Sequence, residues 1–184
     1  YSDNLMMFLD EHNIPFTVMS GLEIKRSMGI RRGKSDKTDS KLIAEYLYEK
    51  REKVKLFKMP SRTIIALKKL ASYRERLVQE RAGFKTRINE FKETFPETEL
   101  EFYTESHKEV IDCFDRQIKQ IDSEIRKLIK KEEKLHQQYE LINTIKGVGP
   151  QTAILMIILT KGFSSFENWR KFASFSGTAP FPNE

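Results

Sequence analysis

Two long stripes of residues spaced alternately three and four apart constrain the fold of this chain more than any other feature. They lie within residues 64–91 and 111–139, and most of their members are apolar. The first consists of Ile64, Leu67, Ala71, Arg74, Val78, Arg81, Lys85, Ile88 and Phe91, and the second of Ile111, Phe114, Ile118, Ile121, Ile125, Leu128, Glu132, Leu135 and Tyr139. Such steps keep side chains on one face of a helix, so each stripe predicts one long helix.

A short acidic segment, residues 96–103, separates the two stripes and begins with a proline. Two long helices joined by a turn pack against each other, so we expect a long antiparallel coiled-coil hairpin over residues 60–139. A helix of 30 residues is about 45 Å long. Periodicity also allows two helices of a compact bundle, but little else in the chain could cover such an arm, which favours a protruding hairpin.

The segments on either side of the hairpin differ in kind. Residues 1–59 combine helical patterns with one apolar, β-branched run, residues 16–19, which predicts a short buried strand. We expect a partial α/β unit here, the edge of a sheet whose remainder is missing. Residues 140–184 return to short amphipathic helices around a glycine-rich turn. The predicted fold class is mostly α with a partial α/β unit, divided at residues 59/60 and 139/140.

The charge of the chain is unevenly distributed. Lys and Arg number 33 against 27 Asp and Glu, and the basic excess lies within residues 21–95, whereas residues 96–140 lean acidic. Concentrated positive charge is typical of nucleic-acid binding, although a solubilising surface explains it equally well. The longest wholly apolar run, residues 153–159, is far shorter than the roughly 20 residues of a bilayer span, so we expect no membrane contact. A single cysteine, Cys113, excludes a disulfide framework and fits a cytoplasmic protein.

Two carboxylates lie three residues apart at the start of a predicted helix, Asp36 and Asp39. One turn apart on one face, they can supply oxygen ligands to Mg²⁺. In the structural alternative, Asp36 is the N-cap and Asp39 takes a capping-box position, and spacing alone favours this reading. The basic loop beside them favours the metal site, because its cations are well placed to hold DNA phosphates. The expected nucleic-acid contacts in this region are Lys25, Arg26, Arg31, Arg32, Lys34 and Lys37.

Residues 145–153, with the sequence IKGVGPQTA, have the form of a helix-hairpin-helix turn. Two glycines allow a tight backbone turn and close approach of a phosphate, and the amides that open the next helix form an anion site. The candidate phosphate contacts are Lys146, Gly147, Gly149 and Thr152. A plain glycine-containing corner between two helices remains the alternative.

The combination of these features resembles the insertion-sequence 110 family of transposases, which join a RuvC-like (RNase H-like) DEDD nuclease domain to a serine-bearing domain through a coiled coil. Residues 33–44 look like the family's K-T-D-x-x-D-A motif, with Ser35 for Thr and Ser40 for Ala, and residues 142–180 look like its glycine-turn block. The resemblance covers nearly the whole chain. It implies a truncated RuvC-like unit over residues 1–59 and the start of the transposase domain over residues 140–184.

The resemblance also implies an activity and its partners. Asp36 and Asp39 would be the last two DEDD carboxylates, with Mg²⁺ as cofactor, in a bacterial DNA recombinase that uses a structured guide RNA and self-associates through its coiled coil. The first Asp, the Glu and the serine nucleophile would lie outside residues 1–184, so we expect the piece alone to be inactive. The competing hypothesis is a non-catalytic, basic coiled-coil module whose nucleic-acid binding depends neither on Mg²⁺ nor on either aspartate.

Overall fold

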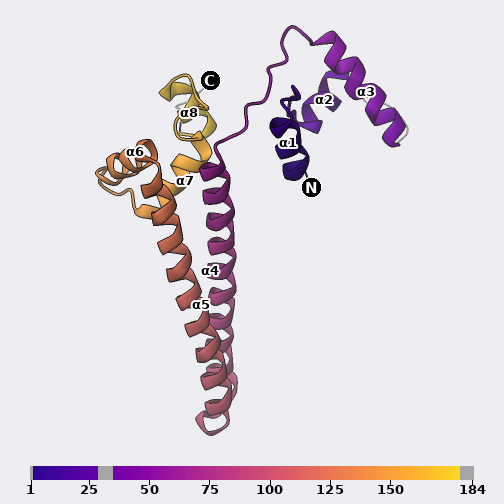
Figure 1. The fold of residues 1–184 in the computed structure, drawn as a ribbon. Helices are drawn as coiled ribbons and strands as arrows, with labels where there is room; N and C mark the ends of the chain where they lie inside the picture. Colours follow the sequence, from indigo (N-terminus) through magenta and orange to yellow (C-terminus); the bar gives the residue numbers. More distant parts are fainter. Residues whose placement is uncertain (1, 29–34, 179–184) are drawn as a thin grey trace, which may run out of the picture. The chain divides into compact units, whose positions relative to one another are not determined.

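The computed structural model describes residues 2–28 and 35–178, and these form two compact units, residues 1–59 and 60–184 (Figure 1). Within the described ranges every regular element is a helix. The prediction of a mostly α protein is therefore confirmed. Each unit is described by itself below.

The first unit contains three helices, α1 (Ser2–Glu11), α2 (Gly21–Met28) and α3 (Asp36–Glu49). α2 packs against α3, and the Tyr46 hydroxyl of α3, on a side chain that is 5% exposed, donates a hydrogen bond of 3.1 Å to Glu23 Oε1 of α2. Burial and this acidic partner raise the pKa of Tyr46 above its usual value, because both disfavour the phenolate.

The strand predicted over residues 16–19 is wrong, and with it the α/β character of the described part of this unit. Residues 14–20 run without regular structure. Phe57 N–H donates to Phe16 O at 2.9 Å, and the Thr17 hydroxyl donates to Lys55 O at 3.0 Å. One backbone hydrogen bond does not make a ladder, and a β-branched run forms a strand only where a neighbouring strand takes up its amides and carbonyls.

The second unit is built on an antiparallel pair of long helices, α4 (Arg62–Thr94) and α5 (Glu97–Lys131), which lie side by side in Figure 1. Cross-helix contacts establish their direction, because the α5 partner moves backward as the α4 residue moves forward. The contacts in order are Arg74 with Asp122, Arg81 with Asp115, Phe84 with Phe114, and Phe91 with Tyr103. An antiparallel helical hairpin is present, while supercoiled packing in the strict sense stays a prediction.

Both ends of the second long helix differ from the sequence-based expectation. The acidic segment expected to form the turn is helical, because α5 begins at Glu97 and only Phe95 and Pro96 separate it from α4. The predicted continuous stripe to Tyr139 is interrupted at Glu132, whose φ of −118° and ψ of 100° are not helical. α6 (Glu133–Asn143) starts there on a new axis, so a regular spacing of side chains conceals a break in the backbone.

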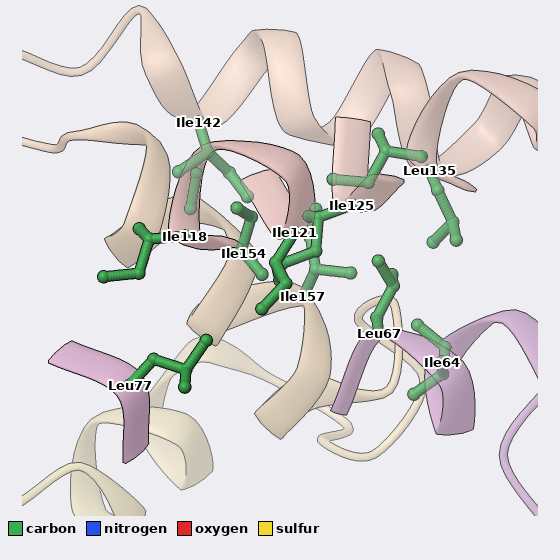
Figure 2. Close-up of a cluster of buried hydrophobic side chains, with 12 residues drawn as sticks. Ile64, Leu67, Leu77, Ile118, Ile121, Ile125, Leu135, Ile142, Ile154 and Ile157 are labelled. Carbon is green, nitrogen blue, oxygen red and sulfur yellow. The ribbon is translucent and has the colours of Figure 1, made fainter. Parts of the chain in front are cut away.

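Two short helices pack at the end of the hairpin near the start of α4, α6 and α7 (Pro150–Thr160), and α8 (Trp169–Phe175) follows α7 in the chain. Four helices share one apolar core (Figure 2). Its buried members are Ile64, Leu67, Leu77, Ile118, Ile121, Ile125, Ile129, Leu135, Ile142, Ala153, Ile154 and Ile157. Both predicted stripes supply this core, so the periodicity identified the buried faces correctly.

Candidate metal and nucleic-acid site

The start of α3 is capped by Ser35. Its Oγ accepts a hydrogen bond of 3.2 Å from the Thr38 amide, and Thr38 Oγ1 accepts one of 3.1 Å from the Ser35 amide. These reciprocal bonds form a capping box. The structural alternative for the two aspartates, in which Asp36 caps the helix, is therefore wrong: Ser35 and Thr38 perform that role.

Asp36 and Asp39 lie in the first turn of α3, and both are exposed. Among the hydrogen bonds and ion pairs of the described residues, neither side chain has a partner. The positive end of the helix dipole stabilises negative charge at this position without direct contacts. The two carboxylates are thus available to a ligand, and the part of the chain that is described contains no group of three or more His, Cys, Asp or Glu side chains able to hold a metal.

Three of the six cations predicted to surround the aspartates can be placed. Lys25 and Arg26 lie in the last turn of α2, Lys37 lies in the first turn of α3, and all three are exposed. Arg31, Arg32 and Lys34 lie outside the described residues. Because α2 packs on α3, these cations and the carboxylates belong to one helical pair.

A basic pocket in the same unit was missed by sequence reasoning. It has a volume of about 420 Å³ and is lined by Lys50, Lys53 and Lys55 together with Glu23 and Tyr46. The sequence contained the evidence for a basic surface here, since residues 50–58 carry five bases and one acid. That run follows α3 directly, and the chain folds it back toward α2.

The glycine turn joins α6 to α7 and uses its two glycines differently. Gly147 has φ +88°, which favours glycine, whereas Gly149 has φ −89°, which any residue adopts. No heavy atom lies within 4 Å of a Cβ built on Gly149. Neither backbone conformation nor packing requires glycine at this N-cap, and Lys146 and Thr152 beside it are exposed.

The first turn of α7 is tied to the hairpin by an aspartate that sequence reasoning did not single out. Asp122 Oδ1 of α5 accepts hydrogen bonds from Gln151 Nε2 at 3.0 Å and from Arg74 Nε at 2.7 Å. The charge of Arg74 within an apolar stripe was the available clue, because a cation on a core-facing row needs a partner. This cluster fixes α7, and hence the turn, to both long helices.

Comparison with protein families gives two matches. A model of the DEDD transposase of IS110, described as a transposase, matches residues 1–96, and one described as the transposase IS116/IS110/IS902 family matches residues 139–184. The first alone covers more than half of the chain. The chain belongs to the IS110 family of transposases. Asp36 and Asp39 fall within the first match, and the glycine turn falls within the second.

Two curated relatives of this IS110-family chain are named pilin gene-inverting proteins, from Moraxella lacunata and Moraxella bovis. Each is 28% identical over 187 residues, which cover 98% of this chain and 53% of the relative. The chain therefore spans about half the length of the curated relatives it matches. No helix among the described residues of this family member is long and apolar enough to cross a bilayer.

Proposed function

We propose that the protein carrying this chain is a DNA recombinase that cuts and rejoins DNA strands, and that its first unit supplies two metal-binding carboxylates. The observation that carries the proposal is the state of Asp36 and Asp39. Both are exposed in the first turn of α3, and because Ser35 and Thr38 form the capping box, neither aspartate is needed to cap the helix. The family match over residues 1–96 supports a DEDD assignment for this pair.

The donor chemistry fits Mg²⁺ in part. Asp36 and Asp39 offer carboxylate oxygens from the first turn of one helix, which is the ligand type that Mg²⁺ prefers. A bound divalent ion would supply charge stabilisation for a phosphodiester under attack. Two carboxylates leave most positions of an octahedral ion open, and the other two members of a DEDD set would have to contribute the rest.

The exposed cations would hold DNA while those carboxylates act. Lys25, Arg26 and Lys37 place positive charge on the same helical pair as the aspartates, which favours phosphates over neutral ligands. We extend the proposal to Arg31, Arg32 and Lys34, which belong to the same basic loop by sequence.

The turn before α7 would form a second phosphate contact. The bare N-cap Gly149 leaves the amides of Gln151 and Thr152 open at the positive end of a helix, the usual arrangement for binding an anion. The exposed ammonium of Lys146 adds charge near this turn. Glycine at 149 would serve close approach of a phosphate, because the fold does not require it.

Self-association and a guide RNA complete the proposal. Three aromatic side chains near the tip of the hairpin, Phe95, Phe102 and Tyr103, are 46%, 75% and 49% exposed. Aromatic groups clustered in this way favour contact with a second copy of the chain. The structured guide RNA rests on the family resemblance alone.

The aspartates are tested by asparagine substitution in the whole protein. Asp36→Asn and Asp39→Asn should each lower strand cleavage at least about 100-fold, because even partners outside the first ligand shell contribute about 10- to 100-fold. Glu49→Gln is the matched control, since it removes an exposed acid from the last turn of the same helix.

Binding measurements separate a metal role from a structural one. Calorimetric titration of the 184-residue chain with Mn²⁺ should show weak binding that either aspartate substitution removes and that Glu49→Gln retains. Intact cleavage by both aspartate variants, with unchanged circular dichroism, would refute the metal assignment.

A further inference from the structure

The net charge of α5 changes from negative to positive half-way along the helix. Glu97–Asp115 carries seven acidic residues and one basic, whereas Arg116–Lys131 carries six basic and two acidic. The six bases, which we name the basic ridge, are all exposed: Arg116, Lys119, Arg126, Lys127, Lys130 and Lys131. The net charge of residues 96–140 does not reveal this ridge, because the seven acids of the first half of α5 outnumber the six cations of the ridge.

The basic ridge lies opposite the buried face of α5. At about 100° per residue it covers about 140° of the helix circumference. The buried face is formed by Ile118, Ile121, Ile125 and Ile129. Within the arc of the ridge the other residues are uncharged, Gln120 and Ser123. The two acids lie at its edges and are paired, Asp122 with Arg74 and Glu124 with Lys127.

The helix dipole does not explain the basic ridge. Cations are favoured near a helix C-terminus only within the last turn. Lys130 and Lys131 fit that rule, but Arg116 and Lys119 lie three or more turns earlier. Repulsion between like charges on one face costs stability, so an acid-free row of six cations favours a ligand that neutralises it.

The composition of the basic ridge selects among possible ligands. It contains no apolar side chain, so it has nothing to insert into a lipid surface. The core of a protein interface is depleted of charge, which disfavours a protein partner. The ridge is straight and about 22 Å long at about 1.5 Å per residue, a length that follows several phosphates of a nucleic-acid strand.

We infer that the basic ridge is a DNA-binding surface, on which the backbone of a duplex lies along the hairpin. The inference rests on the proposed function for the choice of DNA. It adds a contact from the stretch between the two family matches, residues 97–138, to those of the first unit and the glycine turn. Because α5 and α7 share one core, the ridge and the turn are held by one rigid scaffold.

The test compares two variants that lose the same charge. The ridge variant carries Arg116→Gln, Lys119→Gln, Arg126→Gln and Lys130→Gln. The control carries Lys69→Gln, Arg76→Gln, Lys92→Gln and Lys108→Gln, all exposed positions of α4 and α5 outside the ridge. Both are made in the 184-residue chain, and circular dichroism verifies that each retains its helix content.

Binding of a mixed-sequence DNA duplex is measured over a salt series. The ridge variant should bind at least about tenfold more weakly at about 0.1 M salt, and the slope of log K against log salt should fall by about two to four, because each lost phosphate contact removes about 0.9. The control should stay within about threefold of the unsubstituted chain.

Each contrary result has a distinct meaning. Equal losses in ridge and control variants would overturn the inference, because net charge alone would then explain binding. A loss confined to an RNA duplex of the same sequence would overturn the assignment to DNA. A chain that binds no DNA before substitution would also overturn the inference, and the cleavage assay in the whole protein would then decide the proposed function, whereas binding that the ridge variant retains would refute only the ridge.

Discussion

The Arg74–Asp122 pair offers the sharpest test of how the second unit is held together. Arg74 Nε lies 2.7 Å and Nη2 3.4 Å from the two carboxylate oxygens, so the guanidinium engages both. The side chains are 20% and 21% exposed. Gln151 adds a third hydrogen bond to the same carboxylate. Asp122 therefore joins α4, α5 and α7 at one point.

The expected cost of breaking this cluster follows from its contacts. A hydrogen bond to a charged group contributes about 1.5–3 kcal/mol, whereas a fully exposed ion pair contributes about 0–1 kcal/mol. With side chains about one-fifth exposed, Asp122→Ala should lower the free energy of unfolding by about 1–3 kcal/mol. Arg74→Ala should cost somewhat less, because it leaves the bond from Gln151 to Asp122 in place.

A double-mutant cycle measures the pair itself. Urea unfolding of the single variants and of the double variant, followed by circular dichroism, should give a coupling energy of about 1–2 kcal/mol between Arg74 and Asp122. Glu75→Ala with Asp122→Ala is a matched cycle, since Glu75 neighbours Arg74 on α4 but is exposed. Coupling below about 0.3 kcal/mol for the arginine cycle would refute the reasoning.

Three further predictions concern the same unit. Ile125→Ala, at a side chain that is 0% exposed, should destabilise by about 2–5 kcal/mol in urea unfolding, whereas Leu141→Ala, at a side chain that is 70% exposed, should change stability by less than about 0.5 kcal/mol. The hydrogen bond from Arg81 lowers the pKa of Asp115 below its usual value. The stability that this pair provides is thus present above about pH 4 and is lost as the pH falls through the lowered pKa. In that acid range the urea midpoint of Asp115→Asn should therefore vary less with pH than the midpoint of the unsubstituted chain. Gly147→Ala, at φ +88°, should cost about 1–2 kcal/mol through backbone strain, since no heavy atom lies within 4 Å of the added Cβ, and an unchanged melting temperature would contradict this.

The helical hairpin could be predicted from sequence because its signal is local. Residues three and four apart share a helix face whatever surrounds them, so the stripes identified buried positions such as Leu67 and Ile125 before any packing was known. The break at Glu132 could not be predicted in this way. The spacing of side chains passes through it unchanged, and packing of α6 against α7 accompanies the change of helix axis there.

The candidate site likewise combines features that the sequence predicted with features that only the structure decided. The pairing of Asp36 with Asp39 and the glycine turn were visible as spacings, but which residue caps α3 depended on a reciprocal pair of hydrogen bonds between Ser35 and Thr38. Serine and aspartate are nearly equal as N-caps, so propensity alone could not choose between neighbouring positions. Only the position at which α3 begins left the two carboxylates free.

The sequence by itself determined the helical periods, the two glycines of the turn and the family, because each depends on neighbours along the chain. The tertiary structure decided where α5 ends, that residues 16–19 form no strand, and that Asp122 joins three helices. These depend on which distant groups meet, and the free energy of a buried hydrogen bond or an apolar contact is set by both partners together.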